Sequence, residues 1–179
     1  MLTKSTLLAA TLVAGAASSA DAAFLRFLYT GEFEVIAASA TDVDYSFDFV
    51  VVGPQIGGFG ITSGAGTAKQ TFAPGPDGLD AIFVIEGPSP LDTMTIELSG
   101  FLVGPPGAPH GSFAGDLTIT AASGAFAGLF GVGDMSGSMY FTSATGGLMD
   151  GVVQLDVVPA PASLALLASA GLVALRRRR

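Results

Sequence analysis

The sequence predicts an all-β domain, folded either as an antiparallel β-sandwich or as a small barrel of about seven to nine strands. Apolar and polar residues alternate with period two in several runs, as they do in half-buried strands. Clusters of Gly, Pro, Asp and Ser separate these runs at spacings typical of hairpins. Roughly 136 residues between Ala23 and Val158 suffice for one domain with a core, and none of them shows a convincing helical period.

The expected strands follow one another along the chain. The first is residues 24–36. In the second, Tyr45, Phe47 and Phe49 face one way while Ser46 and Asp48 face the other. The remaining expected strands are residues 81–86, 93–98, 117–120, 135–142 and 153–157.

Two glycine-rich segments interrupt this pattern. Residues 53–66 are too irregular for a repeat and predict a long flexible connection or a loosely paired hairpin. In residues 123–133, glycines would supply positive φ angles at turns and bulges. Phe126 and Phe130 would then close one end of the barrel or sandwich.

The N-terminus predicts a signal peptide over residues 1–22. Lys4 gives a short positive region, residues 7–17 an apolar one, and Ala20 and Ala22 a small-x-small site with cleavage before Ala23. A competing site follows Ala20. The β-rich domain, residues 23–157, is therefore expected to leave the cytoplasm.

The C-terminus reads as a sorting signal in three parts. It comprises a proline motif, an apolar run over residues 163–175 and four terminal arginines. As a helix, residues 162–175 would be about 21 Å long, short of the roughly 30 Å hydrocarbon layer, so they predict transient membrane residence. The motif is Val158, Pro159, Ala160, Pro161 and Ala162, and the cluster is Arg176, Arg177, Arg178 and Arg179.

This layout resembles the PEP-CTERM family of exported bacterial proteins, whose C-terminal domain is cut by an exosortase. The resemblance covers residues 158–179, with Ala160 at the usual glutamate position, as in Val-Pro-x-Pro-Ala variants. It implies a Gram-negative host, transient inner-membrane anchoring, cleavage near residues 159–161, and release to the surface or an exopolysaccharide matrix. An uncleaved single-pass tail anchor is the alternative.

The amino-acid composition excludes some kinds of binding site and partner. The chain has no cysteine, so disulfides and thiolate metal sites are excluded and packing must hold the domain together. Between Ala23 and Val158, Arg26 and Lys69 stand against fourteen acidic residues, a net charge of −12. Such a surface repels phosphate backbones, so nucleic acid is not an expected partner.

Few residues suggest chemistry, and no catalytic residue is predicted. His110 is the only histidine, in a proline-rich turn expected to be exposed, and no Gly-x-Ser-x-Gly elbow is present. The only glutamates, Glu32, Glu34, Glu86 and Glu97, have no spacing that defines a glycosidase pair. Calcium is the one candidate cofactor, with solvated surface acids as the alternative. Its candidate ligands are Asp42, Asp44, Asp48, Asp77 and Asp80.

Together these observations predict an exported, non-enzymatic β protein with a structural or adhesive role. The alternative is a secreted module that binds polysaccharide or another ligand, with calcium near residues 42–48. A secreted hydrolase would require His110 or two glutamates to share a pocket.

Overall fold

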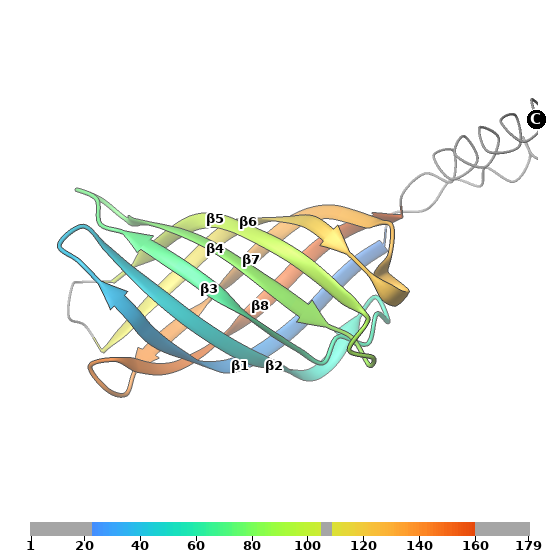
Figure 1. The fold of residues 1–179 in the computed structure, drawn as a ribbon, viewed down its shortest axis with the longest axis horizontal. Helices are drawn as coiled ribbons and strands as arrows, with labels where there is room; N and C mark the ends of the chain where they lie inside the picture. Colours follow the sequence, from blue (N-terminus) through green and yellow to red (C-terminus); the bar gives the residue numbers. More distant parts are fainter. Residues whose placement is uncertain (1–22, 105–108, 160–179) are drawn as a thin grey trace, which may run out of the picture. The chain divides into compact units, whose positions relative to one another are not determined.

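The computed structural model describes residues 23–104 and 109–159, which form a closed antiparallel barrel of eight strands (Figure 1). Each strand pairs with its neighbour in sequence, and β1 pairs with β8 to close the barrel. The all-β prediction is confirmed, and of its two architectures the barrel is the one observed. The strands are β1 (Ala23–Ala38), β2 (Asp42–Ile56), β3 (Ser63–Thr71), β4 (Asp77–Glu86), β5 (Thr93–Val103), β6 (His110–Ala122), β7 (Leu129–Phe141) and β8 (Gly146–Pro159).

Side chains fill the interior of the barrel. Alternation turns every second residue inward, and an aromatic cluster occupies the middle. Phe49 lies at its centre, with its ring centroid 5.1 Å from that of Tyr29 and 6.0 Å from that of Phe83. Because a small barrel has room for few large side chains, others on the inner face are glycines.

Strand β3 carries some of these inward glycines, and its position corrects the expectation for residues 53–66. Residues 53–66 are not one long flexible connection, since residues 53–56 end β2 and residues 63–66 begin β3 and pair with residues 47–50 of β2. Of the two expected forms, the hairpin is therefore the one observed. Positive φ angles occur in this segment at Gly53 within β2, with φ of 72°, and in the connection at Gly57, Gly58 and Gly60, with φ of 104°, 70° and 66°. The inward residues of β3 include Gly64 and Gly66, so the strand lacks the apolar alternation used to find the others.

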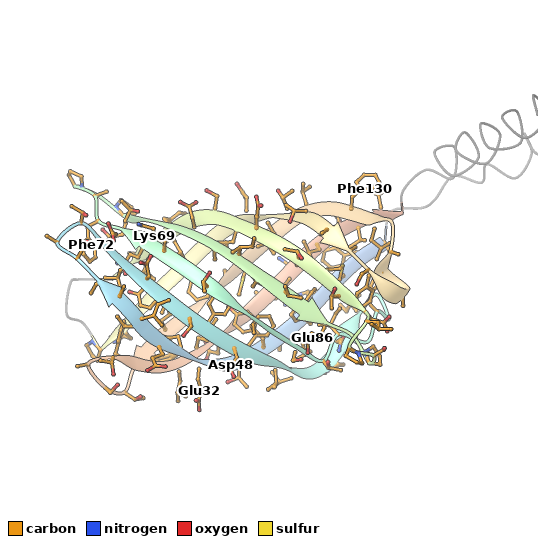
Figure 2. All side chains as sticks on the ribbon, viewed as in Figure 1. Glu32, Asp48, Lys69, Phe72, Glu86 and Phe130 are labelled. Atoms are coloured by element: carbon orange, nitrogen blue, oxygen red, sulfur yellow. The ribbon has the colours of Figure 1, made fainter. Side chains whose placement is uncertain are left out.

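One end of the barrel is closed by the 3₁₀ turn η1 (Gly124–Phe126). The Phe126 side chain is 2% exposed, and its ring centroid is 6.4 Å from that of Phe59 in the β2–β3 turn. The prediction for Phe126 is therefore confirmed, but that for Phe130 is wrong. Strand β7 starts at Leu129, so alternation places Phe130 on the outer wall, 46% exposed (Figure 2).

The expected signal peptide, residues 1–22, and the expected apolar helix, residues 162–175, lie outside the described residues. Within residues 23–104 and 109–159, no helix has the length and apolar character needed to cross a membrane.

Candidate binding cavity at the open end of the barrel

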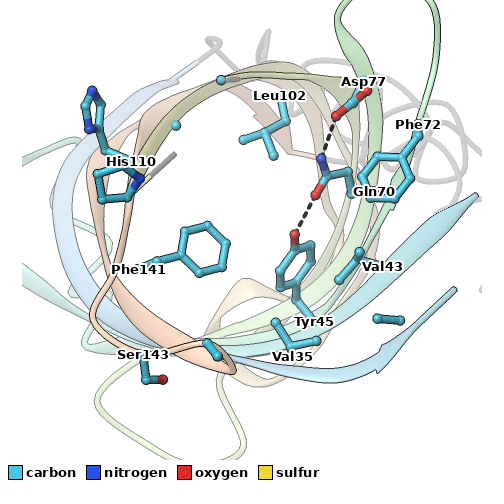
Figure 3. Close-up of a pocket in the computed structure, with 15 residues that line it drawn as sticks. Val35, Val43, Tyr45, Gln70, Phe72, Asp77, Leu102, His110, Phe141 and Ser143 are labelled. Carbon is cyan, nitrogen blue, oxygen red and sulfur yellow. Dashed lines mark hydrogen bonds between the residues drawn. The ribbon is translucent and has the colours of Figure 1, made fainter. Parts of the chain in front are cut away.

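A cavity of about 440 Å³ occupies the end of the barrel opposite Phe126. It lies among the β1–β2, β3–β4 and β7–β8 turns and the start of β6 (Figure 3). Apolar side chains form much of its wall, including Val35, Val43, Leu102 and Phe141. The cavity is therefore a cup with a largely apolar lining.

A chain of hydrogen bonds crosses one wall of this cup (Figure 3). The Tyr45 hydroxyl donates to Gln70 Oε1 at 2.5 Å, and Gln70 Nε2 donates to Asp77 Oδ2 at 2.6 Å. The other carboxylate oxygen, Asp77 Oδ1, accepts from the backbone N–H of Ala73 at 3.2 Å. Burial raises the pKa of Tyr45, and the negative charge of Asp77 raises it further. The Tyr45 hydroxyl is therefore held as a neutral donor.

Pairing between strands brings these three residues together. Tyr45 points inward from β2, and the register that pairs Val43 with Gln70 places the amide on the diagonal next to it. Asp77 begins β4, after the β3–β4 turn. Gln70 is 7% exposed and is the one amide, acid or base of the described ranges that is buried.

The sequence analysis missed Gln70 because it missed β3. The signal was the position of Gln70 at every second residue after Gly64, Gly66 and Ala68, which makes all four share one face of a strand. Asp77 was identified for another reason, as a calcium candidate.

Aromatic rings form the floor of the cup. The rings of Phe33 and Phe141 meet edge to face with centroids 4.9 Å apart, and Phe33 meets Tyr45 in the same way at 5.9 Å. Below them is an internal apolar void of about 40 Å³, lined in part by Met135, Met139 and Met149.

The calcium candidates are spread over the barrel. Asp42 accepts a hydrogen bond from the Thr41 hydroxyl at 3.0 Å and lies 3.6 Å from Lys69 Nζ. The Thr41 hydroxyl, followed by that of Ser39 and the Lys69 charge, lowers the pKa of Asp42. Asp77 belongs to the cup.

The other three candidates point outward from β2 and β4. Asp44 is paired with Lys69. Asp48 lies opposite Glu32, and the side chains of Asp48 and Glu32 project from the outer wall (Figure 2). Asp80 accepts from the Ser99 hydroxyl at 2.9 Å. Within residues 23–104 and 109–159, no group of three or more His, Asp or Glu side chains is arranged to hold a metal ion.

His110 and the glutamates do not form a common site. His110 is the first residue of β6, is exposed, and pairs with Tyr140, so it contributes to the rim of the cup while its imidazole points away (Figure 3). All four glutamates are exposed on the wall, and none lines the cup. The arrangement required for the hydrolase hypothesis is therefore not found among the described residues.

The sorting residues are only partly described. Ala23 begins β1 and pairs with Val157, while Val158 and Pro159 end β8. Ala20, Ala22, Ala160, Pro161, Ala162 and Arg176 to Arg179 lie outside the described residues. Comparisons with known protein families, with curated proteins and with solved structures found no match.

Proposed function

We propose that this chain is an exported protein that its C-terminal signal delivers to the cell surface or to an exopolysaccharide matrix. There the acidic barrel would act as a structural or adhesive component without catalysing a reaction. In this proposal an exosortase-type enzyme cuts the chain near Pro159 to Pro161, after transient anchoring in the inner membrane of a Gram-negative host. The proposal rests on the leader and the tripartite tail of the sequence.

The pairing of Ala23 with Val157 is the structural observation that best supports this proposal. Ala23 and Val157, which lie next to the two processing sites expected in this proposal, are therefore at the same end of the barrel. The outermost core residues near these ends are Leu25 and Val157, both 0% exposed. Cleavage before Ala23 and beyond Pro159 would therefore remove no core side chain and would release a complete barrel.

A closed barrel also suits a structural component outside the cell. Closure leaves no free strand edge, so copies cannot associate by adding strands to one another. The net charge of −12 between Ala23 and Val158 adds electrostatic repulsion between copies. Such a surface keeps the barrel soluble while it is delivered.

Intact mass and C-terminal peptide mapping of the protein from fractionated host cells test the proposal. We expect a chain that begins at Ala23, ends near Pro159 to Pro161, and is found in the medium or matrix. Pro161→Ala should retain the tail and stay in the inner-membrane fraction, whereas Pro88→Ala, in the β4–β5 turn, should be processed normally. A wild-type chain that keeps Arg179 in the inner membrane would refute cleavage and favour the tail anchor.

The structural role has its own test. A strain that lacks the protein should form a matrix with lower adhesion or stiffness, and the wild-type gene should restore it. Unchanged adhesion and stiffness would contradict this role while leaving the sorting proposal intact.

A further inference from the structure

We propose that the cup at the open end of the barrel binds an uncharged amphiphilic small molecule. Its ligand would have an apolar ring or short chain and a hydroxyl or amide head group. This inference goes beyond the proposed delivery and structural role, since neither of them requires a binding site. It rests on the size of the cup, on the polar groups in its wall, and on its charge.

The size of the cup fits a small organic ligand. Its volume of about 440 Å³ lies within the range of roughly 300–1,000 Å³ that is usual for ligand pockets. Val35, Val43 and Leu102 supply aliphatic surface, and Phe141 supplies an aromatic ring. An apolar ring or chain would leave water on entering this space, which favours binding.

The amide of Gln70 supplies the polar contact. Each of its polar atoms has one partner in the structure, Tyr45 for the oxygen and Asp77 for the nitrogen. A glutamine amide has two N–H donors and two oxygen lone pairs, so one of each is left over. A hydroxyl or amide head could both donate to and accept from this buried group, which the apolar wall would otherwise leave partly unsatisfied.

The charge of the cup selects against anions. Asp77 carries a carboxylate in the wall, and no lysine or arginine is among the described residues that line the cup. The surrounding barrel is strongly acidic. A ligand with an ammonium group would gain little binding free energy from Asp77, because this carboxylate already accepts hydrogen bonds from Gln70 and from the Ala73 N–H. The ammonium group would also lose its hydration on entering the cup, which is costly.

A series of four probes with the same phenyl ring tests these requirements. Saturation-transfer NMR titrations would use benzamide, benzyl alcohol, benzoate and benzylamine with the protein recovered from its host. We expect saturable binding of the two uncharged probes and affinities about tenfold lower for the charged ones. Equal or tighter binding of benzoate or benzylamine would overturn the assignment of the head group, and no transfer to any probe would overturn the site.

Two matched pairs of variants locate the binding. Ala38→Trp, at the exposed rim, should abolish it by filling the cup, whereas Ala121→Trp, on the exposed outer face of β6, should not. Gln70→Leu should weaken benzamide binding by about tenfold or more, because it removes both hydrogen bonds that the head group would make with this amide. Gln154→Leu makes the same chemical change on the outer wall, where Gln154 donates to Asp134, and should have no effect.

The rim variant keeps the test decisive, because Gln70→Leu also removes hydrogen bonds that stabilise the fold. A thermal melt establishes whether each variant is folded. Undiminished binding in folded Ala38→Trp would place the probes elsewhere and refute the inference. Neither result affects C-terminal processing, which is measured by mass alone.

Discussion

Replacing Gly66 by alanine should destabilise the barrel, although alanine usually suits a strand better than glycine. A Cβ atom at Gly66 would lie 2.3 Å from the carbonyl oxygen of Ile82 and 2.4 Å from the Cβ of Phe83. The first is a backbone atom of β4, and the second is attached directly to the β4 backbone. A rotamer change therefore cannot relieve these contacts. Strands β3 and β4 would have to move apart.

The magnitude follows from two opposing terms. Overpacking of a filled core costs about 1–3 kcal/mol, and rigid neighbours place this site at the upper end. Alanine recovers about 0.5–1 kcal/mol by restricting the unfolded chain. We therefore expect a net loss of about 2 kcal/mol, equivalent to about 8 °C in Tm for a domain of this size.

Urea unfolding followed by circular dichroism measures this difference, with Gly78→Ala as the matched control. A Cβ atom at Gly78 would meet its nearest neighbours, on Thr71, only at 3.9 Å. Gly78→Ala should therefore stabilise the barrel by about 0.4–1 kcal/mol. A Gly66→Ala protein as stable as the wild type would refute the reasoning that inward glycines of β3 make room for β4.

A double substitution at Gly64 and Phe49 tests the same packing in a second way. A Cβ atom there would lie 2.4 Å from Cζ of Phe49, at the tip of a side chain and not at a backbone. Gly64→Ala should therefore be partly rescued by Phe49→Leu, with a coupling energy of about 0.5 kcal/mol or more. Purely additive effects of the two changes would contradict the packing described.

Three further predictions concern the closed end and the buried tyrosines. Phe126→Ala should cost about 3–5 kcal/mol and Phe130→Ala less than about 0.5 kcal/mol in urea unfolding, because only Phe126 is buried; similar losses would contradict this difference. Tyr29→Phe should stabilise the barrel by about 1 kcal/mol, since the buried Tyr29 hydroxyl has no hydrogen-bond partner among the described residues, whereas Tyr45→Phe should destabilise it by about 1 kcal/mol because its hydroxyl bonds Gln70; the same sign for both would refute this assignment. Burial raises the pKa of Tyr29 and of Tyr45, so the unfolded chain releases these protons first and stability should fall as pH rises above the ordinary tyrosine pKa of 10.0; a flat urea midpoint there would contradict the shifts.

The sequence predicted much of the fold because alternation is a local property. Alternating runs such as residues 45–51 and 153–157 predict which side chains face the core. In the structure, Tyr45, Phe49 and Val153 are buried there. The same property explains the failure at β3. A strand whose inward residues are glycine, alanine and glutamine shows no apolar period, because the large side chains that fill its share of the core come from β2 and β4.

The sequence identified only some of the residues that line the cup. Asp77 and His110 attracted attention by residue type, but Gln70 did not, and the hydrogen-bond chain depends on the register of β2, β3 and β4. Residue type also treated Phe126 and Phe130 alike. The turn before β7 buries the first, and the alternation of β7 exposes the second.

By itself the sequence determined that the domain is made of antiparallel strands and that it is acidic and free of cysteine, and it supplied the terminal patterns on which the proposal of export and sorting rests. Composition and short-range periodicity suffice for these properties, since each depends on neighbouring residues only. The tertiary structure alone decided that the strands close into a barrel and that a cup remains at one end. Closure requires β1 and β8, from opposite ends of the domain, to pair in register, and the cup is the space that inward side chains from several strands leave unfilled.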